Sequence, residues 1–304
     1  MNIKTTLLSS AILVALTACG GSDNDDSPTT PQSAKFSLGV SDAPVSGLRE
    51  VNVVFNSITL RQAEVGQDIT FATREADDES KPEMVNLLDY TGDENDLTMT
   101  SHVVYEDGSI APLVVKRKGN DGIGEIQLDG FTLNQADNDF VLEFDLKKSL
   151  VDPQNSDEIF LKPRGVRLEN LAESEDIEGT VSDALIANCE TDNIALAAAD
   201  GSFAHALYLY SSDVAAPLDI YEVNEDETPA DAPLATADVV FDSEDNQYEF
   251  ELAFITPGDY QLAYTCAAHI DDAEIQDEAF TLYQVKPITV TAGDDLDVTF
   301  TVSQ

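Results

Sequence analysis

Alternation of apolar and polar residues is the feature that most constrains what this 304-residue chain can fold into. The clearest case is the segment FVLEFDL at residues 140–146. Its apolar members, which would share one face of a strand, are Phe140, Leu142, Phe144 and Leu146. Glu143 and Asp145 would then face water. A period of two indicates a half-buried strand, so the segment is predicted to be β structure.

The same alternation recurs along the chain. Residues 51–60 alternate as far as Phe55 and resume at Ile58, and this change of phase predicts a β-bulge near Asn56 and Ser57. Residues 248–266 alternate on both sides of a Pro-Gly turn, which predicts a hairpin. The core members expected in this part of the chain are Phe250, Leu252, Phe254, Tyr260, Leu262, Tyr264, Val298 and Phe300. No stretch has a long helical period, so the chain is predicted to be mainly β.

Residues 1–18 have the pattern of a secretory signal peptide. Lys4 precedes an apolar stretch from Leu7 to Leu16, which is too short to cross a bilayer as a helix. The residues Leu16-Thr17-Ala18-Cys19 resemble the bacterial lipobox, in which the preceding peptide is removed and the Cys receives acyl chains. Several acyl chains anchor a protein stably, at about 0.8 kcal/mol per buried CH2 group. The resemblance therefore implies a lipid anchor on Cys19.

Residues 19–34 follow as a tether that is rich in Gly, Ser, Asp and Pro and has no apolar periodicity. Gly20 and Gly21, rather than Asp, follow Cys19. By resemblance to sorted lipoproteins, this favours the outer membrane over retention in the inner membrane. Which face of the outer membrane the protein occupies stays open.

With Cys19 lipidated, Cys189 and Cys266 are the remaining cysteines. Export would deliver them to an oxidising compartment, where a bridge is favoured over free thiols. Neither residue lies in a CxxC motif or beside a His, so a redox or nucleophilic role is poorly supported. The sequence predicts a Cys189–Cys266 disulfide within one domain.

The charge balance is strongly acidic, with 59 acidic residues against 15 Lys and Arg, and a formal charge of -44. This argues against nucleic-acid binding and against docking on anionic lipid, both of which need clustered cations. Residues 35–172 carry 26 acids and 13 bases, whereas residues 173–304 carry 30 acids and one base, Lys286. The asymmetry predicts two domains with a boundary near residue 173.

Residues 35–172 resemble a known family. The segment KFSLGVSDAPV ends in Ser41-Asp42-Ala43-Pro44-Val45, and similar blocks begin at Met84, Val141 and Ile159. These blocks, in this order, resemble DUF4382, a domain of unknown function in bacterial lipoproteins whose hallmark is a strand ending in Ser/Thr-Asp-Ala-Pro. The passage between Leu97 and His102 is shorter here than in that family. The resemblance implies a β-rich extracytoplasmic domain and brings no established activity.

Residues 177–304 are similar to the transthyretin-like or carboxypeptidase-regulatory-like β-sandwiches. The similarity is carried by the opening strand at 177–181, the turn at 257–260 and the closing segment from Val285. Modules of this kind in secreted proteins are usually spacers or binding domains, and the fold alone does not give the function.

Asp42 is the most notable polar residue of the motif. Its carboxylate could bind a ligand, but an Asx-type turn, in which it accepts hydrogen bonds from nearby amides, is favoured. The concentrated basic residues are Lys147, Lys148, Lys162, Arg164 and Arg167, near Asp145. They could bind an anionic sugar or a phosphate, but internal charge pairing is favoured in so acidic a domain.

No catalytic motif is recognisable. His102, His205 and His269 are isolated, without HExxH or HxH spacing, so a zinc site is poorly supported. There is no GxSxG elbow, P-loop or GxGxxG. Carboxylate pairs for glycoside hydrolysis stay open, because any two of 59 acids could lie at a working separation.

Calcium is the cofactor with most chemical sense, because it takes carboxylate oxygens. The candidate clusters are residues 93–96, residues 242–246, and the group Asp294, Asp295 and Asp297. None has EF-hand spacing, so solvated loops are favoured and no metal ligand is assigned.

These patterns predict two β-sandwich-like domains behind a lipidated, flexible tether at the outer membrane. We expect a non-catalytic binding or adhesion module for an envelope glycan or protein, with no nucleic-acid partner. A structural spacer in an envelope assembly is the alternative, and an extracytoplasmic hydrolase is third. The absence of Trp counts against the glycan version, since sugars stack on flat rings.

Overall fold

The structure is a computed structural model of the chain. It describes residues 6–15, 33–43, 47–61, 68–73, 83–87, 100–118, 124–128, 130–132, 137–153, 156–221, 229–275 and 279–302. The predicted lipidation site Cys19, most of the tether and Pro44 lie outside the described residues.

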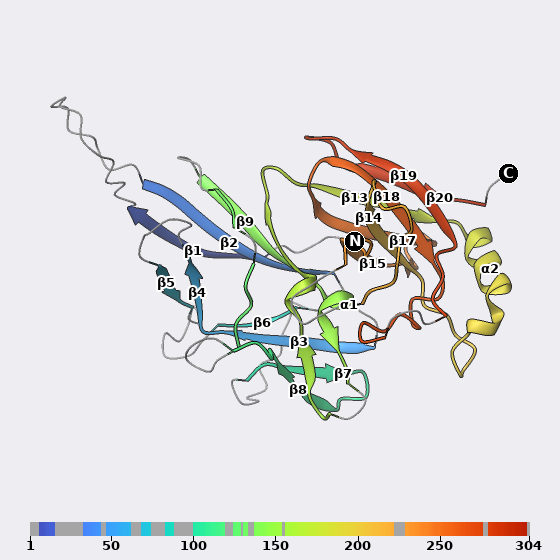
Figure 1. The fold of residues 1–304 in the computed structure, drawn as a ribbon, viewed down its shortest axis with the longest axis horizontal. Coiled ribbons are helices and arrows are strands. Elements are labelled where there is room, and N and C mark those ends of the chain that lie inside the picture. The colour runs from blue at the N-terminus through green and yellow to red at the C-terminus, as the bar shows by residue number, and fades with distance from the viewer. Residues whose placement is uncertain are drawn as a thin grey trace.

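The described residues are mainly in strands, which confirms the predicted fold class (Figure 1). One sheet, in the order β1-β2-β9-β12, contains β1 (Thr6–Ala15), β2 (Ser33–Ala43), β9 (Asp137–Asp145) and β12 (Val166–Asn170). A second sheet, in the order β10-β11-β8-β7-β3-β6, contains β10 (Leu150–Val151), β11 (Ile159–Leu161), β8 (Ile110–Val114), β7 (His102–Tyr105), β3 (Leu48–Phe55) and β6 (Glu83–Asn86). These two sheets are called the first sandwich below.

Strand β1 pairs antiparallel with β2, from Thr6 opposite Val40 to Ala15 opposite Ser33. Its residues belong to the predicted signal peptide. Cleavage after residue 18 stays a prediction. No helix in the described part of the chain is long and apolar enough to span a membrane.

The predicted bulge at Asn56 and Ser57 is wrong. Strand β3 ends at Phe55, and the next residues form β4 (Ser57–Leu60), which pairs with β5 (Ile69–Ala72) in a separate two-stranded sheet. The apolar residues that share the less exposed face of this small sheet are Ile58, Leu60, Ile69 and Phe71. The change of phase in the sequence therefore marks a change of sheet.

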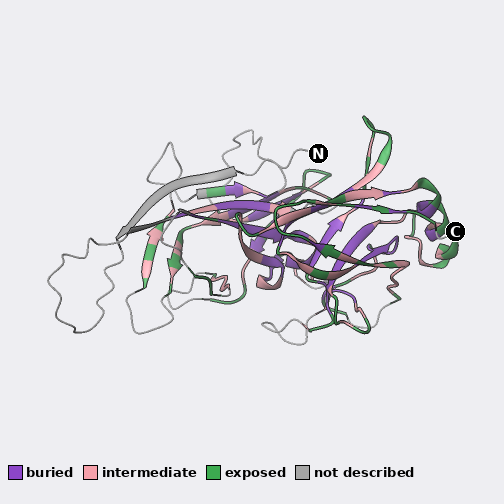
Figure 2. Cartoon of the chain, turned by 90° about the horizontal axis from the view of Figure 1, so that it is seen from above, coloured by how far each residue is buried: buried purple, intermediate pink, exposed green. Residues whose placement is uncertain are grey.

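The core of the first sandwich lies between its two sheets (Figure 2). Leu142, Phe144 and Leu146 are buried in it, as the alternation predicted, and Phe140 is buried against Phe36 and Phe131. The second sheet contributes the core residues that face them, which are Val51, Val53, Val85, Val103, Leu113 and Leu161. Leu146 opens the short helix α1 (Leu146–Ser149), and a 3-10 turn at Pro163–Gly165 leads into β12.

Two further sheets form the second sandwich, which begins at Glu175. One, in the order β16-β17-β13-β20, contains β16 (Val240–Asp242), β17 (Gln247–Ile255), β13 (Glu175–Val181) and β20 (Leu296–Phe300). The other, in the order β15-β14-β18-β19, contains β15 (Ala235–Asp238), β14 (Ala206–Ser211), β18 (Gly258–Thr265) and β19 (Gln284–Val290). The six predicted core members that are buried between these sheets are Phe250, Leu252, Leu262, Tyr264, Val298 and Phe300, and Tyr260 packs half-buried against them.

The hairpin predicted at residues 248–266 is also wrong. Strands β17 and β18 follow each other directly, but β17 pairs with β13 and β16, whereas β18 pairs with β14 and β19. The Pro257 turn therefore carries the chain from one sheet of the sandwich to the other. Phe250 and Leu262 reach the shared core from opposite sheets, which satisfies the same alternation without pairing the two strands.

A β-bulge in β17 removes Phe254 from the predicted core. Ile177 lies opposite Leu252 and Glu175 opposite Ile255, so two residues of β17 face one residue of β13. Phe254 has a φ of 56°, a left-handed conformation that is unfavourable for a bulky residue. Its side chain packs with Val141 of the first sandwich instead.

One helix was missed by the sequence analysis. Helix α2 (Asp183–Asp192) closes one end of the second sandwich and is followed by a 3-10 turn at Ile194–Leu196 (Figure 1). Ser182 caps it by accepting a hydrogen bond from the Leu185 N–H at 3.4 Å. Leu185, Ile186 and Cys189 bury one short face of the helix, which is too brief to produce a long apolar period.

Apolar contacts join the two sandwiches. Val151 and Phe160 of the first pack in one cluster with Tyr208 and Tyr210 of the second. A smaller cluster joins Val141 to Ala253 and Phe254. The second sandwich therefore lies directly against the first.

Candidate functional site

The Ser41-Asp42-Ala43-Pro44 motif lies at the end of β2, which runs parallel to β9. Ser41 is opposite Glu143, and Asp42 is opposite Phe144. Ser41 is buried, and its hydroxyl forms a hydrogen bond with the Glu143 carboxyl group. Asp42 is directed to the other face of the sheet, where burial raises the pKa of its carboxyl group to about 7. The predicted turn involves residues 44–46, outside the described residues, so the turn role of Asp42 stays a prediction.

Glu143 and Asp145 do not face water, which corrects the prediction for β9. They are 2% and 1% exposed, because the second sandwich covers the face of the sheet that alternation assigned to solvent. With Lys148 and Arg167 they form a group that we call the interdomain charge cluster. Period-two alternation identifies the two faces of a strand but not a partner that packs on the polar one.

Asp145 joins the two sandwiches directly. Its carboxylate accepts hydrogen bonds from the Thr236 N–H at 2.6 Å and from the Thr236 hydroxyl at 2.8 Å. It also accepts a bond from the Lys148 N–H at 3.1 Å, which caps α1. The Lys148 ammonium, itself buried, donates to the Leu234 carbonyl at 2.7 Å. Asp145 and Lys148 are thus both hydrogen-bonded to the segment of the second sandwich that contains Leu234 and Thr236.

Arg167 makes the second set of contacts. Its guanidinium donates to the carbonyl oxygens of Ala253 and Phe254, each at 3.1 Å, and pairs with Glu169 at 2.9 Å. The Phe254 N–H donates to Asp176 at 3.0 Å. The strained residue at the bulge is therefore held on both sides by hydrogen bonds to charged groups.

The basic region acts internally, through main-chain carbonyls as well as through the charge pairing that the sequence analysis favoured. Lys147 lies 3.8 Å from Asp238 of the second sandwich, and the Arg164 guanidinium donates to the Lys148 carbonyl at 2.7 Å. Lys162 is buried. Arg167 and Lys148 donate to main-chain carbonyls, so this region fastens the two sandwiches together.

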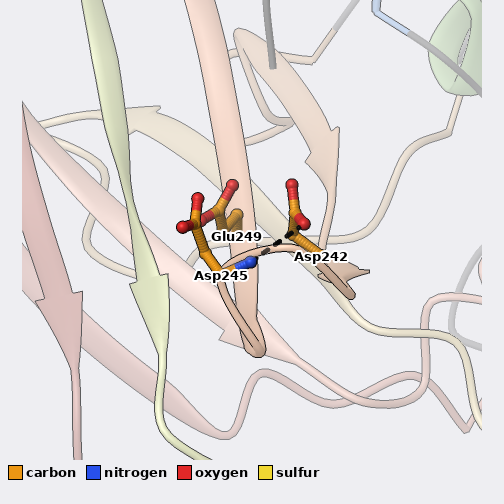
Figure 3. A group of neighbouring side chains, drawn as sticks. All are labelled: Asp242, Asp245 and Glu249. Carbon is orange, nitrogen blue, oxygen red and sulfur yellow. Dashed lines mark hydrogen bonds between the residues drawn. The ribbon is translucent and has the colours of Figure 1, made fainter.

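In the part of the chain that the structure describes, a group of three carboxylates lies at the turn between β16 and β17 (Figure 3). One oxygen each from Asp242, Asp245 and Glu249 lie within 4.8 Å of one another, and the three groups project toward the same side of the turn. Oxygen ligands at this spacing suit a calcium ion. The sequence indicated residues 242–246 but missed Glu249, which joins the group because it lies on the following strand.

Hydrogen bonds within the turn already engage two of these carboxylates. Asp242 accepts from the N–H groups of Glu244 at 2.6 Å and Asp245 at 3.3 Å, and Glu249 accepts from the Gln247 amide at 2.6 Å. The group is therefore also complete as a capped turn.

Of the other two calcium candidates, the structure describes the group Asp294, Asp295 and Asp297, and its three carboxylates do not gather as those at the β16 turn do. Residues 93–96 lie outside the described residues. Asp295 accepts a hydrogen bond from the Asp176 N–H at 3.0 Å, which fastens the start of β13, and Asp294 lies in the turn before β20.

Each of the three histidines has both ring nitrogens in local hydrogen bonds. His102 contacts the Thr100 carbonyl and the Asn52 amide, at 2.9 and 3.2 Å. His205 contacts the Tyr264 hydroxyl at 2.8 Å and Glu190 at 3.3 Å, and burial lowers its pKa. His269 accepts from the Ala204 N–H at 3.3 Å and donates to the Leu196 carbonyl at 2.9 Å.

The predicted disulfide between Cys189 and Cys266 is confirmed. It joins α2 to the end of β18, and both cysteines are buried. The Asn193 amide lies 3.7 Å from each sulfur and 2.9 Å from the Cys189 carbonyl. The bridge fixes the helix against the sandwich.

Residues 33–163 match the family described as a domain of unknown function, DUF4382. The match begins at β2 and ends in the 3-10 turn before β12, and it confirms the resemblance over this part of the chain. Neither a curated protein nor a solved structure matches the chain. The similarity of residues 177–304 to transthyretin-like sandwiches stays a prediction.

Proposed function

We propose that this chain is an outer-membrane lipoprotein, anchored through Cys19, that acts as a non-catalytic binding or adhesion module for an envelope glycan or protein. The observation that carries the proposal is that the buried charged side chains and the histidines are engaged in contacts within the protein. Asp145, Lys148 and Arg167 of the interdomain charge cluster hold the two sandwiches together, and the histidine ring nitrogens form local hydrogen bonds. Surface contact is then the means by which the protein acts.

The surface at β16 is best suited to such a contact. Val240 and Phe241, at the edge of their sheet, are 49% and 47% exposed. Asp242 follows Phe241 in β16, and its carboxylate belongs to the group formed with Asp245 and Glu249. An exposed aromatic ring with a polar rim is typical of interaction sites, and a flat ring also suits a sugar.

The alternative function, a spacer in an envelope assembly, is favoured by a different observation. Apolar clusters and buried charges fix the second sandwich against the first, so the pair forms a stiff unit. Stiffness suits a spacer as well as a binding module.

Partner capture from intact cells distinguishes the two functions. The tagged full-length protein is crosslinked in its own envelope, and bound proteins and glycans are scored separately, with and without calcium. The test variant is Val240→Thr with Phe241→Thr, and the matched control is Ile110→Thr, which changes an exposed apolar residue of the first sandwich.

The binding proposal expects a saturable partner with the natural protein and the control, and its loss with the test variant. Equal capture by all three proteins would show that the contact does not involve Val240 and Phe241 of β16. An absence of any partner would favour the spacer.

A further inference from the structure

Glu143 is a buried carboxyl group at the contact between the two sandwiches, and its hydrogen-bonding capacity is not filled. It is 2% exposed. The Ser41 hydroxyl bonds to the carboxyl group, but no described residue donates a hydrogen bond to its Oε2 atom. A buried carboxylate without donors is unfavourable, whereas a protonated carboxyl group needs fewer of them. The protonated form therefore suits this position.

The charges from the first sandwich do not compensate an ionised Glu143. Arg167, the cross-strand neighbour on β12, favours ionisation, but its guanidinium also serves Glu169 and two carbonyls. Asp42 on β2 and Asp145 on β9 oppose ionisation as like charges. The Lys148 ammonium on α1 is committed to a carbonyl of the second sandwich.

The second sandwich brings polar main-chain groups to this contact. Strand β17 contributes the carbonyl oxygens of Ala253 and Phe254, which face Arg167. Strand β15 contributes Thr236, which binds Asp145, and Asp238, which lies near Lys147. Among the groups described at this contact, none from the second sandwich brings a positive charge to Glu143.

We propose that the contact between the two sandwiches is a pH-dependent latch, closed while Glu143 is protonated and loosened when Glu143 ionises. The proposal does not depend on the proposed binding function.

The direction follows from proton linkage. Burial, opposed by Arg167 and aided by Asp42 and Asp145, raises the pKa of Glu143 to about 8 from its usual 4.5. In the open form the carboxyl group meets water and ionises near the usual value. Between these two pH values the closed form holds the extra proton, so the contact weakens as the pH rises and levels off above about pH 8.

Lys148 acts in a separate pH range. Burial lowers its pKa to about 8 from 10.5, so its contribution changes above pH 8 and favours the closed form as the pH rises further. Measurements between pH 5.5 and 8 therefore avoid the range in which Lys148 acts. Asp42, whose pKa burial raises to about 7, also titrates there, so the effect of Glu143 is read from the comparison with Glu143→Gln at equal pH.

Hydrogen exchange of the full chain tests the latch. Protection is measured for peptides covering β15 and the end of β17. The variant Glu143→Gln mimics the protonated carboxyl group, and it is compared with the natural protein at each pH. Comparison at equal pH removes the intrinsic pH dependence of exchange. Glu106→Gln, in an exposed turn of the first sandwich, is the matched control.

The latch predicts that Glu143→Gln is the more protected protein, and that its advantage over the natural protein grows roughly ten-fold or more between pH 5.5 and pH 8. Glu106→Gln should follow the natural protein throughout. Equal protection of Glu143→Gln and the natural protein at every pH would overturn the proposal.

A second variant covers the case in which Glu143→Gln fails to fold. Ser41→Ala removes the hydrogen bond that favours the ionised form. It should raise the closed-form pKa of Glu143 further, so the loss of protection should continue to a higher pH before it levels off. An unchanged pH profile in Ser41→Ala would also contradict the latch.

Discussion

The Asp145 carboxylate accepts hydrogen bonds from both the main-chain N–H and the hydroxyl of Thr236, a residue 91 positions further along the chain. The same carboxylate caps α1 through the Lys148 N–H. One buried acid thus ends β9, starts a helix and binds the second sandwich. The first sandwich, which contains the DUF4382 match, is therefore completed by a specific contact with the second.

Replacing Asp145 should destabilise the whole chain. Asp145→Ala leaves the N–H groups of Thr236 and Lys148 buried without an acceptor, and we expect a loss of about 3 kcal/mol in the free energy of unfolding. Thr236→Val removes only the hydroxyl and should cost about 1 kcal/mol. Urea unfolding measures both variants, and equal losses would contradict the assignment of the main-chain bond as the stronger contact.

Gly179 should not tolerate a side chain. A Cβ there would lie 1.8 Å from the Val298 carbonyl oxygen and 2.8 Å from the Phe250 ring, at the centre of a sheet. Gly179→Ala should therefore lower the free energy of unfolding by more than about 3 kcal/mol. At Gly130 a Cβ meets nothing within 4 Å, so Gly130→Ala is the matched control and should leave the thermal midpoint nearly unchanged. A stable Gly179→Ala would show that the three strands are not packed as described.

Removing the disulfide should destabilise the second sandwich. The bridge joins residues 77 positions apart, and the paired change of Cys189 and Cys266 to Ser should cost about 2–5 kcal/mol. Without a reductant, alkylation should modify neither Cys189 nor Cys266. After reduction it should modify both, and the mass of the protein measures the difference. Two reactive thiols in the untreated protein would refute the bridge.

Asp42 should make stability depend on pH. Because burial raises its pKa to about 7 from 3.8, the folded form holds the proton longer than the unfolded form. Stability should therefore fall as the pH rises from about 4 to about 7 and then level off. Asp42→Asn carries no charge, so its advantage over the natural protein should grow over this range, to the order of 4 kcal/mol above pH 7.

Unfolding in urea at pH 5, 6, 7 and 8 measures this difference. Asp157→Asn, at an exposed loop position, is the matched control and should show no such growth. A constant difference between Asp42→Asn and the natural protein at all four pH values would place the Asp42 carboxyl group in water.

The sequence predicted the buried faces of strands well, because alternation directly reflects which side chains leave water. Phe144, Leu252 and Phe300 are core residues for this reason. Pairing was harder to predict, because the alternation at residues 248–266 is the same whether two strands pair side by side or face each other across a core. The structure has the second arrangement.

The interdomain charge cluster could not be predicted from local pattern. Glu143 and Asp145 occupy the polar face of β9, and only the distant segment around Thr236 decides that this face is covered. The predicted internal role of the basic residues came from charge balance alone, without naming their partners. For α2, the pair Ser182 and Asp183 was a usable start signal that the search for long apolar periods passed over.

The envelope function rests on Cys19, and the mass of the N-terminal peptide of the protein isolated from its own membranes tests it most directly. We predict a peptide that begins at Cys19 and carries acyl chains, and loss of the protein from the membrane fraction when Cys19 is changed to Ser. A peptide that begins at Met1, or an unmodified Cys19 in a protein that still sediments with membranes, would contradict the account.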